Sequence, residues 1–126
     1  MISYSVYKII HVFGVLLIVM ALGGATLHAA NGGTRESNTS RKLSAISHGV
    51  GMLLVLVAGF GLLARLGIGH GAAWPLWIYL KLVIWAVMGG LLVLVQRVPS
   101  LARPLWIGIP LLGGLAAYVA VMKPGA

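Results

Sequence analysis

Four long apolar segments, separated by polar or glycine-rich stretches, organise the chain. They run over residues 5–30, 43–64, 75–95 and 104–122. Each segment is close to the roughly 20 apolar residues that a helix needs to cross the hydrocarbon core of a bilayer. The intervening stretches, NGGTRESNTSRK, GIGHGAA and QRVPSLAR, are short. The pattern predicts an all-α integral membrane protein, a four-transmembrane-helix up-down-up-down bundle with residues 1–126 in a single domain.

Prolines and tryptophans mark the predicted helix boundaries. Pro75 and Pro104 lie where the first turn of a helix tolerates proline, because the missing N–H would be unpaired there. Trp77 and Trp106 lie near segment ends, as expected for an aromatic belt at the membrane surface. Pro110 lies inside the fourth segment, where it predicts a kink that neighbouring helices can accommodate.

The first segment could be a cleaved signal peptide or a permanent membrane helix. Its apolar stretch from Ile9 to Leu27 is longer than a usual signal-peptide core, and only Lys8 precedes it. We therefore expect it to remain as a membrane helix.

Composition supports the membrane assignment and narrows the chemistry. Of 126 residues, 60% are hydrophobic and 8% are charged, whereas soluble domains carry roughly 25% charged residues. The chain has no cysteine and one acidic residue, Glu36, which excludes disulfides, thiolate sites and paired-carboxylate chemistry. The net charge of +8 is spread over segment ends, which favours anionic lipid headgroups as its contact and argues against nucleic acid.

An even number of spans places both termini on one side of the membrane. The basic residues of that side are Lys8, Arg65, Lys81 and Lys123, and those of the opposite side are Arg35, Arg41, Lys42, Arg97 and Arg103. Cytoplasmic loops carry the excess of lysine and arginine. We therefore predict a multi-pass protein of a bacterial-type inner (cytoplasmic) membrane, with both termini periplasmic.

Glycines are frequent inside the predicted helices, and two interpretations of them are open. The chain has 18 glycines, including Gly51 and Gly59 in the second segment and Gly89 and Gly90 in the third. Small residues let membrane helices approach closely, so the glycines indicate tight packing. Alternatively, they leave room for a flat ligand such as a porphyrin.

Histidine is the informative residue in a chain almost without acids or thiols. His28 ends the first segment and His48 lies near the start of the second, so an antiparallel pair of helices brings both to one side of the membrane. His48 shares a helical stripe with Gly51, and His28 shares one with Gly24. Inward imidazoles with space beside them suit axial haem ligands, whereas imidazoles at the interface would bind loop carbonyls or water.

A second group of candidate residues belongs to the other side of the membrane. Lys8 and His11 share a face of the first helix, and His70 lies in a turn near Lys81 of the third segment. Such lysines commonly extend to the interface. Alternatively, Lys8 and Lys81 hold an anionic group, such as a haem propionate or a quinone oxygen, with His11 as ligand or proton carrier. Because the chain offers them no acidic partner, buried lysines would need a counter-charge from a ligand, a lipid or another subunit.

The run Tyr7-Lys8-Ile9-Ile10-His11 resembles the start of the HemJ-type protoporphyrinogen oxidases, which are small all-helical membrane proteins. Arg41-Lys42-Leu43 and Trp77-x-x-x-Lys81 are similar to the same family's pattern, and the related SirB and CopD families also look like this. The resemblance implies b-type haem on His11 and a functional basic residue at Lys81. The glycine-rich end of the first segment and His48 depart from the oxidase pattern.

Two functions of different classes follow. The first is a haem-binding or redox-linked membrane protein, acting in electron transfer or HemJ-like porphyrin oxidation. Its cofactor-binding residues would be His11, His28, His48, Lys8 and Lys81, with His11 and His48 on the iron of haem b. The second is a non-enzymatic small membrane subunit, assembly factor or scaffold protein. In both, we expect the lipid bilayer as surroundings and a homo-oligomer or a partner membrane subunit as contact.

Overall fold

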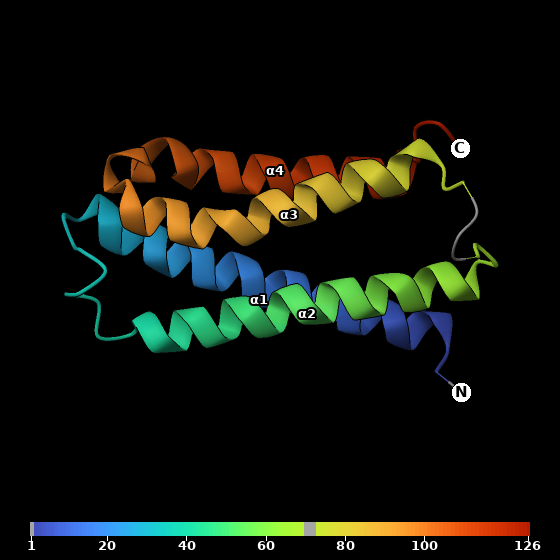
Figure 1. Cartoon of the computed structure of the whole chain (residues 1–126), viewed down its shortest axis with the longest axis horizontal. Helices are drawn as coiled ribbons and strands as arrows, with labels where there is room; N and C mark the ends of the chain where they lie inside the picture. The colour runs from blue at the N-terminus through green and yellow to red at the C-terminus, as the bar shows by residue number, and fades with distance from the viewer. Residues whose placement is uncertain (1, 70–72) are drawn as a thin grey trace.

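The structure, a computed structural model that describes residues 2–69 and 73–126, is a bundle of four α-helices (Figure 1). The elements are α1 (Tyr4–Ala30), α2 (Arg41–Arg65), α3 (Leu76–Arg97), the short 3-10 helix η1 (Pro99–Leu101) and α4 (Ala102–Met122). Within the described residues there is no strand. Each of the four helices is long and apolar enough to cross a membrane. The predicted all-α four-helix fold is confirmed.

Helix bounds differ from the expected ones by at most two residues, and the ends of α1 and α4 agree with them. Hydropathy marks the part of a helix that crosses the hydrocarbon, whereas polar residues extend the helix beyond it. Arg41 and Lys42 belong to α2, although their side chains suggested a loop. Pro75 directly precedes α3, and Pro104 lies in the first turn of α4. The ribbon of α4 continues through Pro110 as one helix.

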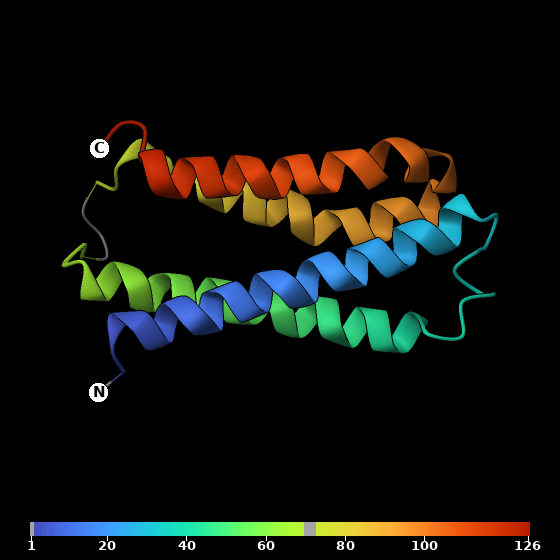
Figure 2. The same ribbon diagram turned by 180° about the vertical axis from the view of Figure 1, so that it is seen from behind.

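The four helices alternate in direction, so the connections gather at two ends (Figure 2). The N-terminus, the C-terminus, the end of α2 and the start of α3 lie at one end, called the termini end below. The α1–α2 loop and η1 lie at the opposite end, called the loop end. His70, which was expected beside Lys81, lies outside the described residues.

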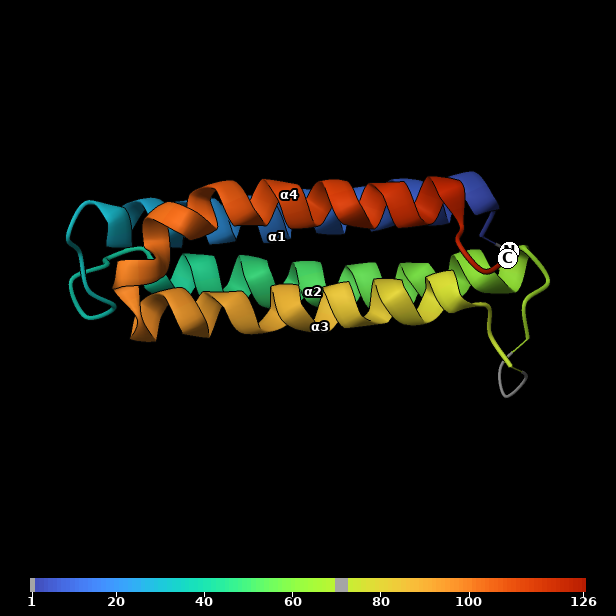
Figure 3. The same ribbon diagram turned by 90° about the horizontal axis from the view of Figure 1, so that it is seen from above.

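The bundle has two layers, with α1 beside α4 in one and α2 beside α3 in the other (Figure 3). The most extensive packing joins α1 to α2, and α1 also contacts α3 across the bundle. Leu22 of α1 is completely buried, and it belongs to one core cluster with Met88 and Val95 of α3 and Ile109 of α4. This core is thin, because most large apolar side chains point outward, as they do in a protein surrounded by lipid.

Candidate functional site

His11 lies in α1 and forms a hydrogen bond with the backbone of α2. Its Nδ1 is 3.0 Å from the carbonyl oxygen of Val55, and the contact is partly buried. A carbonyl oxygen only accepts, so Nδ1–H must be the donor. A neutral imidazole bonded in this way carries its lone pair on Nε2. Within residues 2–69 and 73–126, no hydrogen bond reaches this Nε2.

Glycines of α2 form the surface against which this face of α1 packs. A Cβ at Gly59 would lie 3.5 Å from Cε1 of His11, and a Cβ at Gly61 would collide with the ring of Tyr7. Tyr7 and His11 are one turn apart on α1. Gly61 therefore lets the Tyr7 ring lie directly on the backbone of α2, whereas at Gly59 a side-chain carbon would make only ordinary contact with the His11 ring.

Two lysines, Lys8 and Lys81, lie near His11 at the termini end, and Lys123 lies near Lys81; the four residues are called the termini-end cluster. Lys8 and Lys81 both act electrostatically on His11, and Lys123 acts on Lys81. Lys81 and His11 are half-buried, whereas Lys8 and Lys123 are exposed. The ammonium of Lys8 lies 5.9 Å from the centre of the Tyr4 ring. The expectation that Lys8, His11 and Lys81 belong to one group agrees with this placement.

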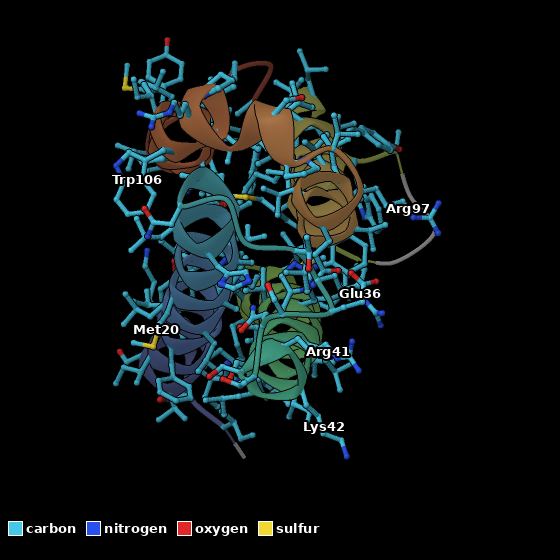
Figure 4. All side chains as sticks on the ribbon, turned by 90° about the vertical axis from the view of Figure 1, so that its left-hand side faces the viewer. Met20, Glu36, Arg41, Lys42, Arg97 and Trp106 are labelled. Atoms are coloured by element: carbon cyan, nitrogen blue, oxygen red, sulfur yellow. The ribbon has the colours of Figure 1, made fainter. Side chains whose placement is uncertain are left out.

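No acidic side chain neutralises the termini-end cluster. The one acidic residue of the chain, Glu36, lies in the α1–α2 loop. Figure 4 shows Glu36 at the loop end, together with Arg41, Lys42 and Arg97. The cluster therefore concentrates basic side chains at an end of the bundle where the chain places no acidic side chain.

His48 is buried between α2 and α3 and is a cross-link between them. Its Nε2 is 3.1 Å from the carbonyl oxygen of Met88, so Nε2 donates and cannot also offer a lone pair in this arrangement. In the opposite direction, Nε1 of Trp85 on α3 donates to the carbonyl oxygen of Met52 on α2, at 3.0 Å. The inward orientation that the Gly51 stripe predicted for His48 is present, with the imidazole bound to backbone.

His28 fastens the α1–α2 loop. Its Nε2 is 2.8 Å from the carbonyl oxygen of Thr34 and 3.1 Å from Oγ of Ser37. Thr34 and Ser37 also bond each other, with the Thr34 N–H donating to Ser37 Oγ and the Ser37 N–H donating to Thr34 Oγ1. This arrangement corresponds to the alternative in which His28 binds loop carbonyls.

The structure does not bring His28 and His48 to a shared site, because His28 binds the loop and His48 binds α3. The helix-contact stripe expected beside His28 is also wrong in part. Gly24 is exposed, and a Cβ there would meet open space, so Gly24 is not at a helix contact. The hydropathy of α1 is apolar all round, so spacing alone could not identify its buried face.

Backbone carbonyls are the partners that sequence reasoning missed. Val55, Met88 and Met52 accept the bonds from His11, His48 and Trp85 through atoms that every residue carries, so no residue type marks them. Lys123 was recognised as basic but was not included in the site. Its place beside Lys81 follows from the antiparallel packing of α3 and α4 at the termini end.

Metal binding by side chains alone finds no support in the described part of the chain, where no group of three or more histidine, cysteine, aspartate or glutamate residues could hold an ion. A haem iron needs only one or two protein ligands, so this finding leaves haem as a separate question. No family model, curated protein or solved structure matches the chain.

Proposed function

We propose that this multi-pass membrane protein binds haem b at its termini end, with His11 as an axial ligand. The observation that supports the proposal best is the hydrogen bond from His11 Nδ1–H to the Val55 carbonyl. Histidines that bind metal usually donate their other ring N–H to a carbonyl or carboxylate, which fixes the tautomer and the ring orientation. His11 meets this requirement and keeps Nε2 for a ligand.

The positive charge around His11 also supports the haem proposal. Lys8 and Lys81 lie within electrostatic range of His11, and the chain provides no acidic partner for them. The two carboxylates of a haem would supply the missing negative charge, so we assign Lys8 and Lys81 to the propionates. A quinone oxygen would use the same lysines. Bound haem would supply one-electron redox chemistry, and the protein would position it and tune its potential.

The geometry favours His11 over the other two histidines as iron ligand. Ligation by Nε2 of His48 would require breaking its bond to Met88, and ligation by Nε2 of His28 would require opening the loop network. If His11 were its one protein ligand, a bound haem would supply chemistry suited to HemJ-like porphyrin oxidation. Electron transfer more often uses two axial ligands. The spin state of the iron distinguishes the two activities within this proposal.

Absorption spectroscopy of detergent-purified protein, oxidised and then dithionite-reduced, tests the proposal. We expect a Soret band and the reduced bands of a b-type haem, both lost in His11→Ala. His28→Ala is the matched control and should keep the spectrum, because His28 binds the loop. Lys81→Gln should weaken haem binding by about tenfold, as expected for removing one charge-assisted hydrogen bond. A colourless wild-type protein after expression with ample haem would overturn the proposal.

A specific observation favours the second function, a small membrane subunit, assembly factor or scaffold. His11, His28 and His48 all bond to backbone carbonyls, which is enough to explain them as structural cross-links. Under this function, the protein is colourless, His11→Ala lowers the unfolding temperature without a spectral change, and a partner subunit or a second copy co-purifies with it.

We place the protein in a bacterial-type inner membrane with both termini periplasmic. Arg35, Arg41, Lys42, Arg97 and Arg103 all lie at the loop end, and an excess of arginine and lysine is typical of the cytoplasmic side. The chain has no native cysteine, so single cysteines report the orientation directly. Ala126→Cys should react with a membrane-impermeant maleimide in intact spheroplasts, and Thr39→Cys should react only after lysis. The reverse pattern would invert the assignment.

A further inference from the structure

An apolar groove runs between α3 and α4 and belongs to none of the sites above. Its lining is entirely aliphatic, its volume is about 280 Å³, and it is open to the surroundings of the bundle. The lining residues are Leu80, Val83, Ile84, Val87, Leu112, Leu115 and Val119. Several of them remain substantially exposed, with 60% for Val83 and 50% for Leu115.

The groove lies in one half of the membrane. Leu80 is one turn inside the start of α3, and Val119 is one turn before the end of α4, so one end of the groove opens at the termini end. From there it extends to Val87, about 10 Å along α3 at 1.5 Å per residue. One leaflet of hydrocarbon is about 15 Å thick. The groove therefore has the length and the aliphatic lining to hold the part of a single acyl chain that is nearest the headgroup.

Positive charge lies where that acyl chain would join its headgroup. The side chain of Lys123 follows Val119 by one turn, and its ammonium is 5.6 Å from the centre of the Trp77 ring. Trp77 precedes Leu80 by one turn on α3. Lys81 is within electrostatic range of Lys123, and the one acidic residue of the chain is at the loop end. Lys123 lies one turn beyond the groove lining, and no acidic side chain lies at this end of the bundle, which favours an anionic group beside Lys123.

We propose that the groove holds one acyl chain of an anionic phospholipid, whose phosphate lies at Lys123 beside Trp77. Of the termini-end cluster, this site uses Lys123, which was not assigned to the haem; His11, Lys8 and Lys81 are not part of the groove lining, which is aliphatic. Free phosphate could bind Lys123 but has no acyl chain to occupy the groove. A zwitterionic lipid could occupy the groove but has no net negative charge to pair with Lys123. Both features are required for retention.

Native mass spectrometry of the full chain, delipidated in detergent and then titrated with single lipids, tests the proposal. We expect one phosphatidylglycerol to remain bound, with binding at least fivefold tighter than that of phosphatidylcholine of the same chain length. A fivefold effect corresponds to one basic residue near a membrane surface. Inorganic phosphate should neither bind measurably nor displace the lipid. Equal binding of the two lipids, or displacement by phosphate, would overturn the proposal.

Paired variants separate the groove from the charge. Leu115→Trp fills the groove and should abolish retention, whereas Leu111→Trp, on the same helix but outside the groove, should leave it unchanged. Lys123→Gln should weaken retention about fivefold, whereas Lys42→Gln at the loop end should not. Retention by Leu115→Trp would contradict the proposal. So would a wild-type dimer that Leu115→Trp dissociates, because the occupant would then be a second copy of the chain.

Discussion

The helix α2 has two neighbours, α1 and α3, and the two interfaces are held together by opposite means. Against α1, backbone meets backbone, since a Cβ at Gly51 would lie 2.7 Å from the carbonyl oxygen of Gly14. Against α3, the backbones stay further apart, and long side chains reach across. His48 and Trp85 do so reciprocally, each donating to a carbonyl of the facing helix.

The two interfaces differ in the interactions that stabilise them. Close approach through glycine maximises dispersion contacts, and it fails sterically when a side chain is added. A hydrogen bond across a wider gap is directional, and its contribution in a membrane is modest. The carbonyls of Met52 and Met88 lie inside helices and already accept a backbone hydrogen bond, so releasing His48 or Trp85 leaves no unpaired carbonyl. We therefore expect the α1–α2 interface to tolerate substitution less well than the α2–α3 interface does.

The largest effect is expected from adding one methyl group to the α1–α2 interface. In Gly51→Ala, the new Cβ would meet backbone of α1, which cannot move aside as a side chain can. We expect a loss of about 3 kcal/mol in the free energy of unfolding, measured by denaturation in mixed micelles. Gly113→Ala is the matched control, because a Cβ there meets open space, and its stability should be unchanged or slightly higher. Equal stability of the two variants would refute the close-packed interface.

A smaller effect is expected at the α2–α3 interface. Trp85→Phe removes the donor to Met52 and keeps most of the ring, so we expect a loss of about 1 kcal/mol. His48→Phe removes the donor to Met88 and should cost a similar amount.

The double variant sharpens this comparison. If the two bonds form one reciprocal contact, His48→Phe/Trp85→Phe should destabilise the protein by less than the sum of the single variants. Strict additivity in the same denaturation assay would mean that the two bonds are independent. Trp106→Phe, on an exposed position of α4 that Figure 4 shows pointing outward, is the control for loss of an indole.

The smallest effect is expected at Gly59, within the α1–α2 interface itself. A Cβ there would make ordinary van der Waals contact with His11, at 3.5 Å from Cε1. Gly59→Ala should therefore change the free energy of unfolding by less than about 0.5 kcal/mol. A loss comparable to that of Gly51→Ala would show that the whole glycine face, and not one crossing point, determines the distance between α1 and α2.

The sequence was sufficient for the helices and for part of the candidate site. Length and apolarity identify four spans, because hydrocarbon imposes one simple requirement on each of them. The grouping of Lys8, His11 and Lys81 was also predictable, since their positions relative to the helix starts place them at one depth. The inward orientation of His48 followed from its spacing to Gly51.

The buried faces of the helices and the hydrogen-bond partners of the histidines could not be predicted, because they depend on how the helices pack. Every helix is apolar on all sides, so the exposed side of Gly24 could not be distinguished from a contact face. The hydrogen-bond acceptors of His11 and His48 are backbone atoms, which no residue pattern marks. Haem and lipid binding stay predictions for the experiments above.

The unequal interfaces also have a consequence for biogenesis. The α1–α2 hairpin contains the most extensive helix–helix packing of the bundle, the close glycine contact, and a loop with hydrogen bonds of its own. It also leaves the ribosome first, and N-terminal units generally fold first during synthesis. We therefore expect the α1–α2 hairpin to form in the membrane first, and α3 and α4 to pack against it afterwards. A truncated chain ending after α2 should insert as a stable hairpin, whereas α3 and α4 expressed alone should be degraded.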